Sequence, residues 1–192
     1  MKTPLQLKTL ADLLAQAEHY ANFCLSTSGS MAPALFLIGD KGPRLFCPPS
    51  LHCIEDKETF AKLARLLCIV HNASAMVIVL EAWMKMAAPG ENLDLTEPPS
   101  EAFDRMEVVS LMGESREGQQ QKILKIVRSG NHNFFSLVDA TPKLDSFEGR
   151  FAQILPAKPV TPEDRVMAEA MLGIKDIGKP GPAVRLSRRR RQ

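Results

Sequence analysis

The stretch AMVIVLEAWMKM, residues 75–86, decides the fold of this chain. It begins with a continuous, β-branched apolar run and then alternates, which predicts a strand in the interior of a sheet. The alternation divides the side chains between two faces, one with Met76, Ile78, Leu80, Ala82, Met84 and Met86, the other with Val77, Val79, Glu81, Trp83 and Lys85. Any architecture for this chain has to be built around this strand.

Two helices and a hairpin are predicted ahead of this strand. Residues 5–24 have an apolar residue at every third or fourth position, the period of an amphipathic helix. Residues 34–38 and 44–47 predict two short strands around the turn at 39–43. After the prolines at 48 and 49, Asp56 is placed to cap a second helix that ends near His71.

The chain after residue 86 predicts more strands and a last helix. Residues 106–112 and 122–128 predict a second hairpin joined through 113–118, and 134–138 follows a further turn. A short docked element is expected around Phe147, Phe151, Ile154 and Leu155. Thr161, Pro162 and two acids predict a helix start, and Gly173 predicts its end.

These elements predict an α/β domain of the α+β type, with a mainly antiparallel five-stranded sheet and helices packed on it, in the order α-β-β-α-β-β-β-α. Profilin-like and roadblock-like domains have a similar order over residues 5–173, a resemblance of element order that implies nothing about function. The glycines and prolines at 178–182 predict a single α/β domain over 1–178 and a flexible basic tail over 179–192.

Composition excludes several classes of protein. The chain is 45% hydrophobic and 24% charged, an ordinary balance for a globular protein. Its longest apolar run, Ala75 to Leu80, is far shorter than the ~20 residues of a membrane-spanning helix, and no signal-peptide core follows Met1. Four cysteines without a scaffold spacing favour a reducing compartment. We therefore expect a soluble, cytoplasmic protein without a membrane partner.

The net charge of +2 conceals a segregation of charge. The tail has no acid, and removing its six cations from the 24 of the chain leaves 18 bases against 22 acids. These cations are Lys179, Arg185, Arg188, Arg189, Arg190 and Arg191. Adjacent guanidinium groups attract phosphates or carboxylates, so the tail predicts binding of nucleic acid or of an acidic protein surface. The exposed acidic loop expected at 87–104 is one such surface within the chain itself.

The candidate metal and nucleophile residues carry no diagnostic spacing. Cys47, His52 and Cys53 are the only cluster of soft ligands, but a zinc site pairs its ligands in two separate knuckles. We therefore expect no metal, no cofactor and no catalytic cysteine. Glu81 is a candidate buried carboxylate, and Glu107 or Lys125 could come beside it if the strands pair. The simpler interpretation is that the strand emerges into solvent at Glu81.

Without a catalytic constellation, the sequence favours a non-catalytic interaction or regulatory protein, of bacterial or mobile-element type. It would bind a macromolecular partner, most simply a protein, through a sheet edge or a helical face, with the tail adding electrostatic contact. Two alternatives remain at this point. One is a nucleic-acid-binding protein that uses its arginine-rich tail, and the other is a small metal-dependent hydrolase built around Glu81.

Overall fold

The computed structural model describes residues 7–48, 51–85, 98–128, 135–142 and 146–173. In chain order its elements are α1 (Leu10–Ser28), β1 (Ala34–Gly39), β2 (Gly42–Phe46), α2 (Ile54–Val70), β3 (Ala75–Met84), β4 (Met106–Ser115), β5 (Gly118–Arg128), β6 (Phe135–Asp139) and α3 (Pro162–Met171). The α+β class and the predicted order of helices are thus confirmed. The predicted tail and residues 87–97, most of the acidic loop predicted at 87–104, lie outside the described residues.

The strands form one sheet in the order β2-β1-β3-β4-β5-β6, and every neighbouring pair is antiparallel. The expectation of five strands is one too low, because all four segments after α2 that carry a strand pattern pair in the sheet. The β4–β5 hairpin is also longer than predicted. Its turn is only Arg116 and Glu117, with Ser115 paired to Gly118, so residues 113–115 belong to a strand and not to a connection.

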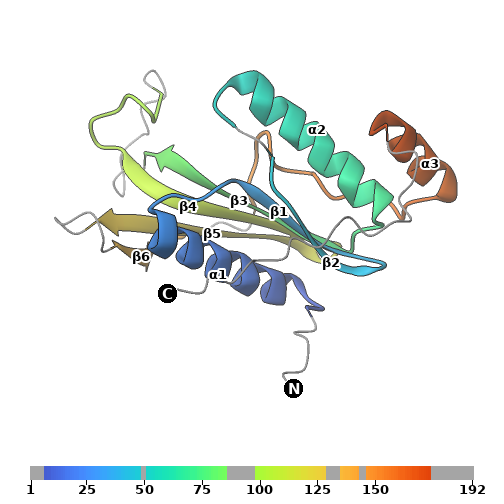
Figure 1. Ribbon diagram of the computed structural model, residues 1–192, viewed down its shortest axis with the longest axis horizontal. Coiled ribbons are helices and arrows are strands. Elements are labelled where there is room, and N and C mark those ends of the chain that lie inside the picture. Colours follow the sequence, from blue (N-terminus) through green and yellow to red (C-terminus); the bar gives the residue numbers. More distant parts are fainter. Residues whose placement is uncertain (1–6, 49–50, 86–97, 129–134, 143–145, 174–192) are drawn as a thin grey trace, which may run out of the picture.

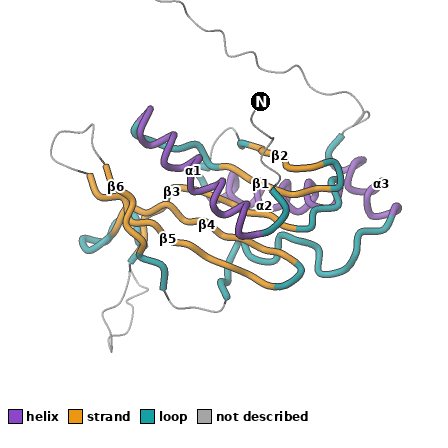
Figure 2. Tube along the Cα trace, turned by 90° about the horizontal axis from the view of Figure 1, so that it is seen from below, coloured by secondary structure: helices purple, strands orange, loops and turns teal. Residues whose placement is uncertain are grey.

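Helices cover both faces of the sheet, so that β3 is buried on two sides. In Figure 1, α1 lies below the sheet while α2 and α3 lie above it, and Figure 2 views the molecule from the α1 side. On the α1 side Val77 and Val79 join a core with Leu13 and Val109. On the α2 side the core is Met76, Ile78, Leu35, Leu37, Phe60 and Ala64. The two faces predicted for β3 are therefore confirmed.

The helix ends follow local capping chemistry. Thr9 caps α1 in a capping box with Asp12, and Gly29 ends the helix at a left-handed φ of 74°. Thr161 begins α3 with Pro162 in its first turn, as predicted. The predicted cap Asp56 is wrong, since Cys53 is the cap and Asp56 instead accepts the His52 N–H. In the described part of the chain, no helix is long and apolar enough to cross a membrane.

Candidate functional site: a groove at the free edge of β3

β3 extends beyond the strand that pairs with it on one side. β4 pairs with all of β3, from Ala75 to Met84, whereas β1 pairs only as far as Val79. Within the described residues, Leu80–Met84 therefore has no strand beside it on the β1 side. An unpaired edge presents a row of backbone N–H and C=O groups that another chain can bind.

This free edge lines a groove of about 700 Å³, which we call the edge groove. Because the edge belongs to both faces of the sheet, side chains from both faces reach it. The groove is lined by Met31, Ala32, Pro33, Pro48, Leu51, His52, Lys57, Leu80, Glu81, Ala82, Trp83, Pro99, Ser100, Arg150 and Phe151. Apart from β3 itself, its walls thus come from four segments that are distant in sequence.

The first wall is the α1–β1 connection, residues 29–33, and three side chains hold it toward the α1 face. The Met31 N–H donates to a carboxylate oxygen of Glu81. The Tyr20 hydroxyl donates to the Ala32 carbonyl at 3.1 Å. Arg128 donates to the Gly29 carbonyl, also at 3.1 Å. These contacts fix the connection as one wall of the groove, tied through Met31 to Glu81 of β3.

Glu81 is half-buried at the point where β3 leaves the core. Burial raises the pKa of its carboxyl group, the Met31 N–H lowers it, and the nearby Glu107 carboxylate raises it again. Glu107 itself is held by Arg128 through two hydrogen bonds of 2.9 and 2.6 Å. The expected approach of Glu107 is therefore found, but its oxygens are engaged by a guanidinium.

Lys125 does not join this cluster. It pairs with Val108, one register position away from the α1-facing pair Val109 and Leu124, so its side chain lies on the opposite face of the sheet. Among the residues that the structure describes, no three His, Cys, Asp or Glu side chains gather as a metal site. The geometry around Glu81 therefore fits a structural role, in which its carboxylate holds the α1–β1 connection, and offers no support for a metal-dependent hydrolase.

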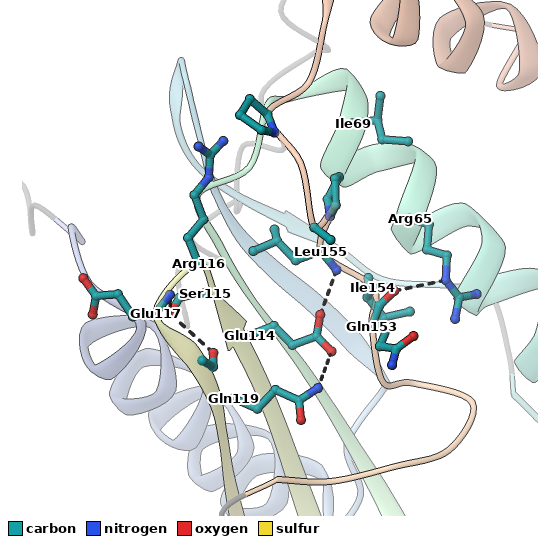
Figure 3. Close-up of a pocket in the computed structure, with 14 residues that line it drawn as sticks. Arg65, Ile69, Glu114, Ser115, Arg116, Glu117, Gln119, Gln153, Ile154 and Leu155 are labelled. Atoms are coloured by element: carbon teal, nitrogen blue, oxygen red, sulfur yellow. Dashed lines mark hydrogen bonds between the residues drawn. The ribbon is translucent and has the colours of Figure 1, made fainter.

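The second wall belongs to residues 146–155, which we call the strap, and a buried glutamate fixes its C-terminal end. Glu114 is only 3% exposed and accepts the Leu155 N–H at 2.8 Å. Its other oxygen accepts a hydrogen bond of 3.2 Å from the side-chain NH₂ group of Gln119. The side-chain oxygen of Gln119 in turn accepts the Phe147 N–H at 3.3 Å. Figure 3 shows Glu114 between Gln119 and Leu155. One relay of polar groups thus holds both ends of the strap.

Arg65 of α2 holds the middle of the strap. Its guanidinium donates to the backbone carbonyls of Arg150, Ala152 and Gln153 at 3.3 to 3.4 Å. The expected docking of this segment is confirmed, since Phe147, Ile154 and Leu155 are buried and Phe151 packs edge-on against Phe60. Arg150 and Phe151 are therefore presented to the edge groove by a segment without regular secondary structure.

The strap also borders a second pocket, of about 680 Å³, beside the β4–β5 turn. Arg65, Arg116 and Glu114 line it (Figure 3). Both oxygens of Glu114 already accept hydrogen bonds, and the described residues contain no buried side-chain polar atom without a partner. The buried carboxylate of this pocket is thus used for structure, and we place the candidate site in the edge groove.

The polar groups that line the edge groove are predominantly cationic or neutral. Lys57 and Arg150 line it opposite a single acid, Glu81, whose carboxylate faces the Met31 N–H. Arg150 has one distant ion pair, 4.0 Å from Glu58. Trp83 is 44% exposed and carries the Arg105 guanidinium 4.5 Å above its ring. The groove therefore combines apolar surface with a positive rim.

Several candidates from the sequence fall inside or beside this groove. Glu81 and His52 line it, whereas Cys47 and Cys53 are exposed free thiols that the groove does not include. The predicted tail residues Lys179, Arg185 and Arg188–Arg191 lie outside the described part of the chain.

Glu114 and Arg65 were missed by the sequence reasoning. The available signal for Glu114 was the alternation of β4, which continues past Met112 to Ser115.

No protein-family model, no curated protein and no solved structure matches this chain. The resemblance to profilin-like and roadblock-like domains consequently remains one of element order.

Proposed function

We propose that this protein is a non-catalytic interaction or regulatory protein that binds an extended segment of a partner protein in the edge groove. The observation that carries the proposal is the length of β3, Leu80–Met84, that no described strand pairs with on the β1 side, inside a groove with fixed walls. A partner segment would add a strand there, with main-chain hydrogen bonds supplying affinity and alternate side chains supplying specificity. Five residues of strand provide about 17 Å of edge.

The walls support this proposal because they are held before any partner arrives. Glu81, Arg128 and Tyr20 hold the α1–β1 connection, and Glu114 and Arg65 hold the strap. A preformed groove avoids part of the ordering cost of binding. The outer strands β2 and β6 are also edges, and β2 carries Pro43, which lacks a backbone donor.

The lining residues indicate the chemistry of the partner. Leu51, Leu80 and Phe151 offer apolar contact, while Lys57 and Arg150 attract carboxylates. We therefore infer a partner segment with both apolar and acidic side chains, since the apolar residues and the cations line the groove on the same α2 side of the sheet. A lysine-rich segment of equal length should be rejected.

A peptide titration tests this proposal directly, because Trp83 is the only tryptophan and lines the groove. A short synthetic peptide that alternates valine and glutamate should change the Trp83 fluorescence saturably. The same peptide with N-methyl groups on alternate residues keeps its side chains but loses strand pairing, and it should bind at least about tenfold more weakly. Equal affinity for both peptides would overturn strand addition.

Charge variants then test the rim. Lys57→Glu should weaken binding of the acidic peptide by roughly two- to fivefold or more, and should favour a valine–lysine peptide instead. Lys122→Glu is the matched control, since Lys122 pairs with Glu18 on the α1 side and does not line the groove. An unchanged preference in Lys57→Glu would remove the inferred acidic partner.

A second candidate function rests on the four consecutive arginines at 188–191. If the tail binds nucleic acid, affinity for a short DNA duplex should fall steeply with salt and should largely vanish when residues 184–192 are deleted. Binding that ignores salt, or that survives the deletion, would exclude this function.

We further propose that the protein acts in the cytoplasm. All four cysteines are free thiols, and Cys68 is buried in the α2-side core, where burial raises the pKa of its thiol to about 12. Fractionation of cells that produce the tagged protein tests this placement, which recovery from an oxidising compartment would contradict.

A further inference from the structure

α3 presents its apolar side outward. Val166, Met167 and Met171 are 65 to 67% exposed, whereas only Ala168 is buried against the rest of the domain. Pro162, Glu163 and Ala170 complete a hollow of about 450 Å³ with Val166 and Met167 on this outer side. A surface helix of a globular protein ordinarily turns its apolar stripe to the core, so this outward apolar face is a candidate docking surface.

Acidic residues border the apolar face of α3. Glu163 and Asp164 occupy the first turn of the helix, and Glu169 lies in its last turn. The only cation of α3, Arg165, is engaged by Asp40 of the β1–β2 turn at 2.8 Å. An occupant of this face should therefore combine apolar anchors with positive charge.

We propose that the outer face of α3 binds the chain's own segment at residues 183–191, AVRLSRRRR. Val184 and Leu186 are its apolar anchors, and Arg185 with Arg188–Arg191 supplies the charge that the face lacks. This contact uses a different surface from the edge groove and does not depend on it. The apolar pair lies over Val166 and Met167, and the arginines lie beside Glu163 and Asp164.

Chain length permits this contact. α3 ends at Met171, and Gly173 follows with a left-handed φ of 65°, which turns the chain away from the helix direction. The helix is about 15 Å long at 1.5 Å per residue. The ten residues from 174 to 183 reach up to about 35 Å when extended, more than the return path along the helix.

The size of the face favours a tethered occupant over a second copy of the chain. The face is one side of a single ten-residue helix, whereas a stable interface between separate proteins needs about 800 Å² of accessible surface, roughly 20–30 residues, from each partner. A short tether supplies an effective concentration in the millimolar range, which makes a small contact sufficient.

Methionine-methyl NMR of the full chain tests this proposal. Met167 and Met171 report on the face, and Met76, fully buried in the α2-side core, reports on the fold. In the double variant Val184→Ser/Leu186→Ser, the resonances of Met167 and Met171 should shift while that of Met76 stays in place. The control Ser187→Ala, in the same segment, should leave all three unchanged.

A charge variant and a dilution experiment provide two further tests of this contact. Glu163→Lys should shift the Met167 and Met171 resonances in the same direction as the double variant, and Glu117→Lys, an exposed acid of the β4–β5 turn, should not. Tenfold dilution of the wild type should change nothing. Unmoved Met167 and Met171 resonances in the double variant would overturn the proposal. A shift on dilution would instead assign the face to a second copy and would overturn the tethered contact.

Discussion

Replacing Glu114 by glutamine should loosen the strap without changing the volume of the side chain. Glu114 accepts two N–H groups, from Leu155 at 2.8 Å and from Gln119 at 3.2 Å, and it is 3% exposed. Glutamine retains one acceptor and places an NH₂ group against one of the two donors. Hydrogen bonds to charged groups contribute about 1.5–3 kcal/mol, so we expect Glu114→Gln to cost about 2 kcal/mol.

Thermal unfolding and amide exchange measure this cost separately. For a domain of this size, a loss of about 2 kcal/mol lowers the melting temperature by about 4–8 °C. If the loss is concentrated in the strap, the Leu155 N–H should exchange about thirtyfold faster. Because Arg150 and Phe151 belong to the strap, affinity for the valine–glutamate peptide should fall as well.

Glu117→Gln is the matched control for this prediction. Glu117 is exposed in the turn of the same hairpin, and its replacement should move the melting temperature by no more than about 2 °C. If Glu114→Gln melts like the wild type and the Leu155 N–H keeps its exchange rate, the relay through Glu114 does not hold the strap.

Two further predictions concern pH and packing. The raised pKa of Glu81 means that the folded protein holds this proton more tightly than the unfolded chain, so its contribution to stability is lost as the pH rises from about 4.5 through the folded value. The free energy of unfolding of Glu81→Gln, measured in urea, should therefore rise relative to that of the wild type as the pH is raised from about 4 to about 7. If the difference between the two proteins does not change with pH, the pKa of Glu81 is not raised in the folded protein. At Gly39, an added Cβ would lie 2.7 Å from the His71 carbonyl oxygen. Gly39→Ala should cost about 1–3 kcal/mol of unfolding free energy by calorimetry, whereas Lys41→Ala in the same turn should cost less than about 0.5 kcal/mol; equal melting of the two would refute the close contact.

Local patterns predicted the elements of this fold well. The alternation of β3 and the caps of α3 depend on neighbours a few residues away, and both were correct. One error lies where distant contacts decide, and another lies within a single turn. Residues 113–115 carry a turn-forming glycine, yet they pair as strand because β3 and β5 lie on either side of them. The cap of α2 is Cys53 and not Asp56, which instead accepts the His52 N–H from inside the first turn.

The candidate site was less accessible from the sequence than the fold. Glu81 could be singled out, since an acid in an apolar strand is visible without coordinates. Its partner, the Met31 N–H, lies 50 residues away, and the strap meets Arg65 across more than 80 residues. Contacts between residues so far apart in the chain produce no periodic pattern in the sequence from which they could be predicted.

By itself, the sequence determined the elements, the two buried faces of β3 and the segregation of positive charge into the tail, because these follow from side-chain periodicity and composition. Only the tertiary structure decided that β1 stops short of β3, that the strap crosses to Glu114, and that α3 turns its apolar side outward. The physical reason is that an unpaired edge and an exposed face are defined by which neighbours are absent. That depends on where every other described segment lies, and no local pattern encodes it.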